Sequence, residues 1–147
     1  MARAERIDAY AASPDAIRTL WAVEKYIKNC GLEQSLIELV KMRASQINGC
    51  AFCLVMHSTD ARKNGESEKR LYLLDAWREA TVFSERERAA LAWTDALTKI
   101  AETHAPDDVY EQAKAQFNEK ELADLTVIIG IINLWNRLSI GLRYLHD

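Results

Sequence analysis

The sequence predicts an all-α fold, a single domain of about six to seven helices that spans residues 1–147. Helix breakers are rare, with five glycines and two prolines in the chain, whereas the strong helix formers alanine and leucine are abundant. No stretch shows the sustained alternation of apolar and polar residues that is typical of a half-buried strand. Neither a linker nor an internal repeat divides the chain, which favours one domain.

Capping residues and glycines mark where the helices begin and end. Ser13 before Pro14 is typical of an N-cap followed by the first helical residue, and Gly31 is typical of a helix stop. Ser84 and Glu87 have the spacing of a capping box. These signals predict helices over about residues 14–30, 33–47, 50–63, 67–79 and 84–102, then a short helix after Pro106 and a last helix after Asn118.

The last predicted helix is apolar on nearly every face. Its apolar residues are Leu122, Leu125, Val127, Ile128, Ile129, Ile131, Ile132, Leu134, Trp135 and Leu138. A helix that is apolar all round is buried on all sides. We therefore expect a central helix or one shared at a subunit interface, and we hypothesise a homo-oligomer.

Charge and hydropathy exclude several classes of function. Lys and Arg number 19 against 22 Asp and Glu, so the chain lacks the basic excess of a nucleic-acid-binding protein. The longest apolar run, Leu125–Leu134, is too short to span a bilayer, which needs about 20 residues. The first residues contain no apolar segment typical of a secretory signal. We expect a cytoplasmic protein that binds neither nucleic acid nor membranes.

Two of the three cysteines form a Cys-x-x-Cys pair at the start of a predicted helix. Cys50, Cys53 and His57 share one face of that helix because residues three or four apart are neighbours. Cys50 lies in the first turn, where the free N–H groups and the helix dipole favour a thiolate. His57 can accept a proton from Cys53 or hold its thiolate. This pattern predicts redox or nucleophilic chemistry.

A carboxylate from the preceding helix is expected close to His57. If the two helices fold back about Gly49, Glu38 lies 11 residues before the turn and His57 lies 8 after it. At about 1.5 Å per residue their heights differ by roughly 4–5 Å, which a glutamate side chain can bridge. The predicted relay runs from Glu38 to His57 to Cys53.

Two other interpretations of these four residues stay open at this point. They could supply four ligands to zinc, but structural zinc sites usually take ligands from two separate segments, and no second Cys-x-x-Cys is present. We therefore expect no metal. The cysteines could instead act only as small buried hydrophobic residues, in which case the protein would be a helical assembly module without enzymatic activity.

The segment from Glu38 to His57 resembles the core of the alkylhydroperoxidase D-type family, within the carboxymuconolactone decarboxylase superfamily. The family pattern is Glu, eleven residues, then Cys-x-x-Cys-x-x-x-His, which Glu38, Cys50, Cys53 and His57 match. The likeness covers most of the chain and includes Tyr72–Arg78, Glu85–Trp93 and Ile132–Arg137.

The resemblance implies an all-α fold that assembles as trimers or hexamers. It also implies a thiol-dependent peroxidase in which Cys53 attacks the peroxide and Cys50 closes a disulfide, while Glu38 and His57 relay protons. An external dithiol would reduce the disulfide, and no cofactor is required. The helix dipole alone favours Cys50 as the more acidic thiol, but the spacing of His57 from Cys53 agrees with the family assignment.

The chain departs from the family pattern at Phe52, where well-studied members carry an additional histidine. An alternative function is therefore a thiol–disulfide oxidoreductase or redox sensor with little peroxidase activity. The decarboxylase branch lacks the Cys-x-x-Cys pair, so Cys50 and Cys53 argue against lactone decarboxylation.

Overall fold

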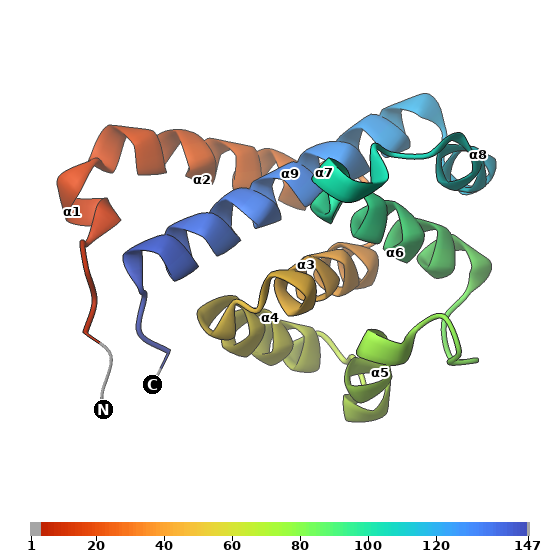
Figure 1. The fold of residues 1–147 in the computed structure, drawn as a ribbon, viewed down its shortest axis with the longest axis horizontal. Coiled ribbons are helices and arrows are strands. Elements are labelled where there is room, and N and C mark those ends of the chain that lie inside the picture. Colours follow the sequence, from red (N-terminus) through yellow and green to blue (C-terminus); the bar gives the residue numbers. More distant parts are fainter. Residues whose placement is uncertain (1–3, 147) are drawn as a thin grey trace.

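Residues 4–146, the part of the chain that the computed structural model describes, form helices and loops without a strand. This confirms the predicted all-α class, and Figure 1 shows the path of the chain. The helices are α1 (Ala9–Ala12), α2 (Pro14–Lys28), α3 (Gln34–Asn48), α4 (Ala51–Lys63), α5 (Glu68–Leu73), the 3-10 helix η1 (Leu74–Ala76), α6 (Glu85–Thr98), α7 (Ile100–Thr103), α8 (Asp107–Gln116) and α9 (Glu119–Leu142).

The differences from the predicted boundaries lie in short segments. The helix predicted to run to Glu79 ends at Leu73 and continues as the 3-10 helix η1. The helix predicted to run to about Glu102 is interrupted at Lys99, which separates α6 from α7. The four-residue helix α1, capped by the side chain of Asp8, was not predicted, because one turn shows no periodic pattern.

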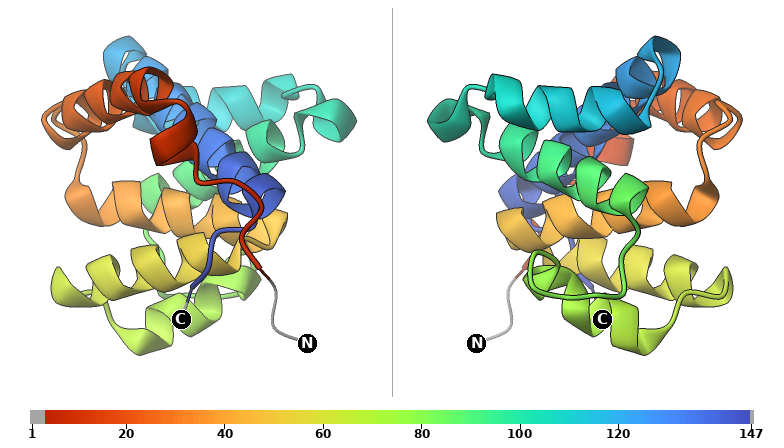
Figure 2. Two further views of the ribbon diagram at one scale, coloured as in Figure 1. Left: turned by 90° about the vertical axis from the view of Figure 1, so that its left-hand side faces the viewer. Right: turned by 90° about the vertical axis from the view of Figure 1, so that its right-hand side faces the viewer.

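Helix α3 lies at the centre of the fold. Ten consecutive residues, Leu36–Ser45, are buried, including the charged residues Glu38, Lys41 and Arg43. Figure 2 shows α3 between α4 on one side and α2 with α9 on the other, and it contacts α4, α6 and α9. One apolar core joins α3 to α2, α6, α8 and α9, and a second joins it to α4, α5, η1 and α6.

Ion pairs allow a helix with this many charges to be buried. Arg43 donates from Nε to Asp95 Oδ1 at 2.8 Å and from a terminal nitrogen to Asp75 at 2.9 Å. Asp95 also accepts from the Trp77 indole at 3.2 Å and from Arg78 at 2.7 Å. Because buried charges need such partners, this cluster fixes α3 against η1 and α6.

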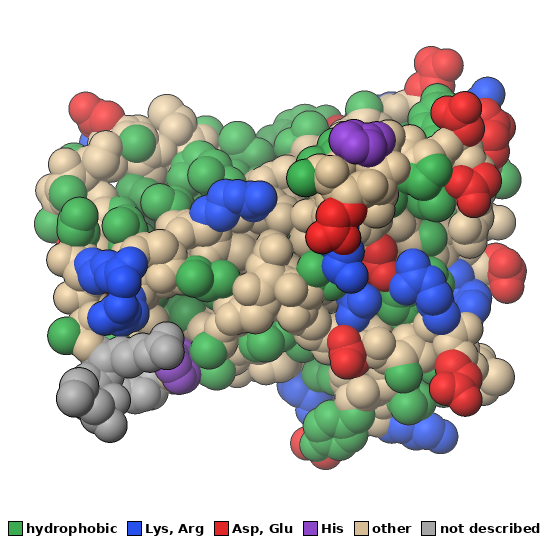
Figure 3. Space-filling model, viewed as in Figure 1, with side chains coloured by type: hydrophobic (Ala, Val, Ile, Leu, Met, Phe, Trp, Pro, Cys, Tyr) green, Lys and Arg blue, Asp and Glu red, His purple; other side chains and the backbone are tan. Residues whose placement is uncertain are grey.

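Helix α9 is less buried than its sequence predicts. It contacts α2, α3, α4, α6 and α8, yet Val127, Leu134 and Ile140 are 45%, 39% and 47% exposed. Figure 3 shows apolar side chains gathered along the face formed by α2 and α9. By length and hydropathy alone, α9 is long and apolar enough to cross a membrane. Core helices of soluble proteins meet the same two criteria. The expectation of burial on all sides is wrong for the isolated chain.

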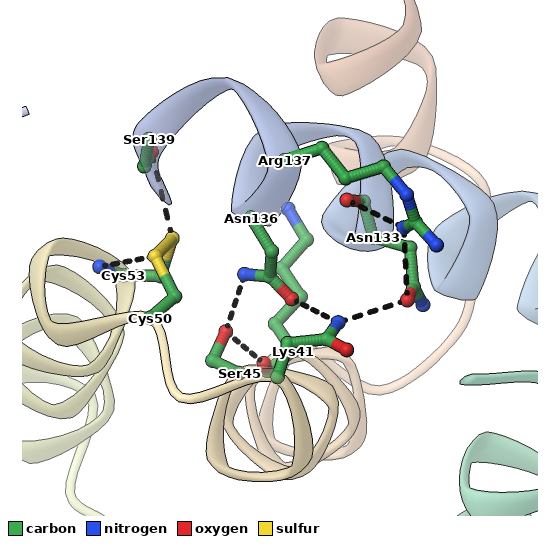
Figure 4. Close-up of a disulfide and its surroundings, with 9 residues drawn as sticks. Lys41, Ser45, Cys50, Cys53, Asn133, Asn136, Arg137 and Ser139 are labelled. Carbon is green, nitrogen blue, oxygen red and sulfur yellow. Dashed lines mark hydrogen bonds between the residues drawn. A yellow bond between two sulfur atoms is a disulfide. The ribbon is translucent and has the colours of Figure 1, made fainter. Parts of the chain in front are cut away.

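A network of buried amides joins the end of α3 to α9 (Figure 4). Asn48 Nδ2 donates to the side-chain oxygens of Asn133 and Asn136, each at 2.9 Å. Asn136 Nδ2 in turn donates to Ser45 Oγ at 3.0 Å, and Ser45 donates to the Lys41 carbonyl. This network holds the last turn of α3, and hence the turn into α4, at a fixed place.

We expect Asn136→Ala to lower the free energy of unfolding by about 2 kcal/mol, because Ser45 and Asn48 each lose a buried hydrogen-bond partner. Urea denaturation monitored by circular dichroism measures this change. The matched control is Asn29→Ala at an exposed asparagine, which should cost less than about 0.5 kcal/mol. Equal losses in the two variants would contradict the assigned role of the network.

Candidate functional site

The Cys-x-x-Cys pair lies at the N-terminus of α4, as predicted. Gly49 ends α3 in the left-handed conformation, with φ 69° and ψ 38°, which glycine adopts without a steric penalty. The next residue, Cys50, is the N-cap of α4, and its sulfur accepts a hydrogen bond from the Cys53 N–H at 3.3 Å. Cys50 and Cys53 form a disulfide, with Cα atoms 5.3 Å apart (Figure 4).

The two sulfur-bearing residues lie on different cavities. Cys53 lines a cavity of about 660 Å³, whereas Cys50 lines a smaller one of about 130 Å³ under residues 143–146. Each cysteine is 1% exposed. Ser139 Oγ lies 3.7 Å from Cys53 Sγ, and its hydroxyl is the donor here because a disulfide sulfur carries no hydrogen. A small molecule in the large cavity therefore meets Cys53.

The large cavity combines apolar aromatic walls with charged groups. Its lining comes from α1, α2, α3, α4, α9 and the C-terminal segment. The aromatic residues that line it are Tyr10, Trp21, Phe52, Trp135 and Tyr144. A volume in this range accommodates small organic molecules, and it exceeds what a diatomic or triatomic substrate would fill.

His57 is a buried base on the wall of this cavity. It is 8% exposed, and its Nε2 has no hydrogen-bond partner among the described residues. Burial, together with the charge of Lys41, lowers the pKa of His57 from 6.5 to about 4. The imidazole is therefore neutral near pH 7 and can accept a proton.

Glu38 lies on the same cavity but is not hydrogen-bonded to His57. It is 5% exposed and accepts hydrogen bonds from Asn64 and, at 3.5 Å, from Gln34. The predicted direct contact is absent, and Asn64, the C-cap of α4, donates to Glu38 Oε1 instead. The structure thus brings all four predicted residues to one region, with Glu38 and His57 lining a common cavity.

Sequence reasoning missed a buried ion pair beside these residues. Lys41 donates to Glu24 at 2.6 Å, and Glu24 also accepts from the Trp135 indole at 3.0 Å. Lys41 follows Glu38 by three residues on α3, so the spacing alone could have placed it on the same face. Glu24 and Trp135 come from distant helices and carried no signal in the sequence.

Residues 4–146 contain no group of three or more His, Cys, Asp or Glu side chains that could hold a metal ion. Cys30, the remaining cysteine, is a free thiol at the end of α2, and its backbone carbonyl accepts from Lys120.

Comparison with known proteins identifies the family. The sequence profile of the carboxymuconolactone decarboxylase family matches residues 12–96, more than half of the chain. The uncharacterised protein YdfG of Bacillus subtilis strain 168 is 41% identical over 138 residues, which cover 94% of each chain. The chain therefore belongs to the carboxymuconolactone decarboxylase family.

Solved structures with the same fold include proteins of the predicted type. A protein of unknown function from Agrobacterium tumefaciens, described as a candidate antioxidant defence protein AhpD, has a TM-score of 0.95 and 49% identity. The match covers 98% of this chain and 99% of that one. An uncharacterised peroxidase-related protein from Silicibacter sp. TM1040 has a TM-score of 0.82 and 21% identity over 95% of this chain and 74% of its own. The first of these supports the resemblance to the alkylhydroperoxidase D-type family, and the second shows the fold.

The depressed pKa of His57 makes the protein less stable in mild acid. Between the ordinary pKa of 6.5 and the folded value of about 4, the unfolded chain binds a proton that the folded chain does not. The free energy of unfolding therefore falls as the pH falls, by about 2 kcal/mol from this residue between about pH 7.5 and pH 5.

Urea denaturation at both pH values measures this loss, and His57→Gln should remove it. The control is His104→Asn at an exposed histidine, which should keep the full pH dependence. An unchanged pH dependence in His57→Gln would show that His57 is not the group responsible.

Proposed function

We propose that this protein is a thiol-dependent peroxidase that reduces organic hydroperoxides through a Cys50–Cys53 dithiol/disulfide cycle. The observation that carries the proposal is the position of Cys53, which is paired with Cys50 and lines the same cavity as the neutral, buried His57. The membership in the carboxymuconolactone decarboxylase family and the AhpD-type structural relative agree with it.

In the first step of the proposed cycle, Cys53 attacks the hydroperoxide. His57, whose imidazole is neutral near pH 7, accepts the thiol proton. The thiolate then bonds to the terminal oxygen, the O–O bond breaks, and the alcohol leaves once it receives a proton. Cys53 becomes a sulfenic acid. Glu38 supplies a second proton-transfer group on the cavity wall.

In the second step Cys50 resolves the sulfenic acid. Its thiolate, favoured at the N-cap of α4, attacks Cys53 Sγ and displaces hydroxide, which leaves as water with the proton that the Cys50 thiol released. An external dithiol then attacks Cys53 from the large cavity, and Cys50 leaves as a thiolate that accepts the Cys53 N–H. A second thiol exchange releases the oxidised reductant and restores both thiols.

Exchange of each cysteine for serine tests this cycle. We expect Cys53→Ser to abolish hydroperoxide turnover, because the nucleophile is lost. We expect Cys50→Ser to stop after one half-reaction and to leave a sulfenic acid on Cys53. Intact mass spectrometry measures both outcomes, through loss of two hydrogens in the parent protein and through a dimedone adduct in Cys50→Ser.

The matched control for these variants is Cys30→Ser at the free thiol outside the site, which should turn over normally. Normal turnover in both Cys50→Ser and Cys53→Ser would refute the cycle.

Phe52 motivates a second candidate function, a thiol–disulfide oxidoreductase or redox sensor. This residue places an apolar ring, without a titratable group, directly before Cys53 on the wall of the large cavity. A poorly assisted peroxide reaction would leave disulfide exchange as the main activity of the pair.

The variant Phe52→His separates the two candidates. If His57 already supplies the base, we expect the second-order rate of Cys53 oxidation by cumene hydroperoxide to change by less than about threefold. A gain of about 10²-fold would favour the oxidoreductase or sensor, in which Phe52 limits the reaction. Phe52→Leu is the control, because a gain shared by both variants would reflect access to Cys53 rather than proton transfer.

A further inference from the structure

Two buried side-chain polar atoms among residues 4–146 have no hydrogen-bond partner, and both belong to the wall of the large cavity. They are His57 Nε2 and the hydroxyl oxygen of Tyr144. A buried polar atom without a partner destabilises a fold, so each such atom calls for an explanation. Their shared location, on the cavity that Cys53 also lines, points to a ligand that pairs with both.

Neighbouring contacts hold the Tyr144 ring in place. Its backbone N–H donates to the Ser139 carbonyl at 2.8 Å, just after α9 ends at Leu142. The ring packs edge-on against Phe52, with centroids 5.5 Å apart, and lies 6.3 Å from the ring of Tyr10. Tyr144 lines both the large cavity and the small one, as do Phe52 and Ser139. It therefore lies on the boundary between the cavity that Cys53 lines and the cavity that Cys50 lines.

The two unpartnered atoms differ in what they offer. Neutral His57 presents a nitrogen that accepts a proton. Tyr144 presents a phenol, and burial, followed by the charges of Tyr10, Asp8 and Glu5, raises its pKa above the ordinary value of 10.0. The phenol therefore stays protonated near neutral pH and can donate. A reaction between a thiol and a hydroperoxide is assisted by one group of each kind, because one proton leaves the thiol and one reaches the departing oxygen.

We propose that Tyr144 is a catalytic residue that donates its phenolic proton to the oxygen that leaves when Cys53 attacks a hydroperoxide, a role that rests on the proposed peroxidase function. The sulfur–oxygen bond forms, the O–O bond breaks, and its electron pair goes to the leaving oxygen. Tyr144 converts that oxygen to the alcohol and recovers a proton from solvent, while solvent takes the thiol proton from His57. The net reaction turns one thiol and one hydroperoxide into one sulfenic acid and one alcohol.

The variant Tyr144→Phe tests this role because it removes only the hydroxyl and keeps the ring against Phe52. The measured quantity is the second-order rate of Cys53 oxidation in the reduced protein, followed by stopped-flow fluorescence and intact mass. With tert-butyl hydroperoxide, whose leaving group is a basic alkoxide, we expect a loss of about 10²-fold. With peracetic acid, whose leaving group is a carboxylate that needs no proton, we expect a loss below about threefold.

The unequal response to the two oxidants is the signature that a purely structural role would not produce. An equal loss with both oxidants, or no loss with either, would overturn the role of Tyr144 while the parent protein still reacts. Failure of the parent protein to react with either oxidant would overturn the peroxidase function as well. The control Tyr72→Phe, at an exposed tyrosine on α5 outside the cavity, should react as the parent does with both.

Discussion

The hydrogen bonds that join the end of α3 to α9 determine where the Cys50–Cys53 pair lies. Asn48 and Asn136 bind each other, and Asn136 binds Ser45, immediately before the chain turns at Gly49. Since the turn is fixed, Cys50 begins α4 and Cys53 faces the large cavity beside Ser139. A rotation of this turn would move both sulfurs away from α9 and separate them from the groups on its surface.

The burial of charged groups is the second constraint, because α3 occupies the centre of the molecule although its sequence is far from apolar. Arg43 is neutralised by Asp95 and Asp75 on the side away from the cavity. On the cavity side, Lys41 is neutralised by Glu24, yet its charge still disfavours protonation of His57. The same burial therefore leaves a neutral imidazole on the wall of the cavity that Cys53 lines.

The sequence predicted well whatever depends on local signals. The helix class, the helix starts after Ser84 and Asn118 and the position of Cys50 follow from residues a few places apart. The predictions from the sequence failed where the interacting residues come from segments far apart in the chain. Asn64, not His57, is hydrogen-bonded to Glu38. The helix at the centre of this chain is the polar α3, and the other expectation for the apolar α9, a face shared at a subunit interface, stays a prediction. Hydropathy periodicity could not show this, because paired charges can be buried as well as apolar residues.

The residues around the large cavity lie partly inside and partly outside the segment that matches the family profile. Glu38, Cys50, Cys53 and His57 all fall within the segment that matches the family profile, residues 12–96. The walls formed by Tyr10, Trp135, Ser139 and Tyr144 lie outside that segment. Mutation can therefore reshape the chamber in which a substrate binds without touching the redox motif. Two members of the family that share this motif can differ in the molecules they admit, so inheritance of the motif does not fix specificity.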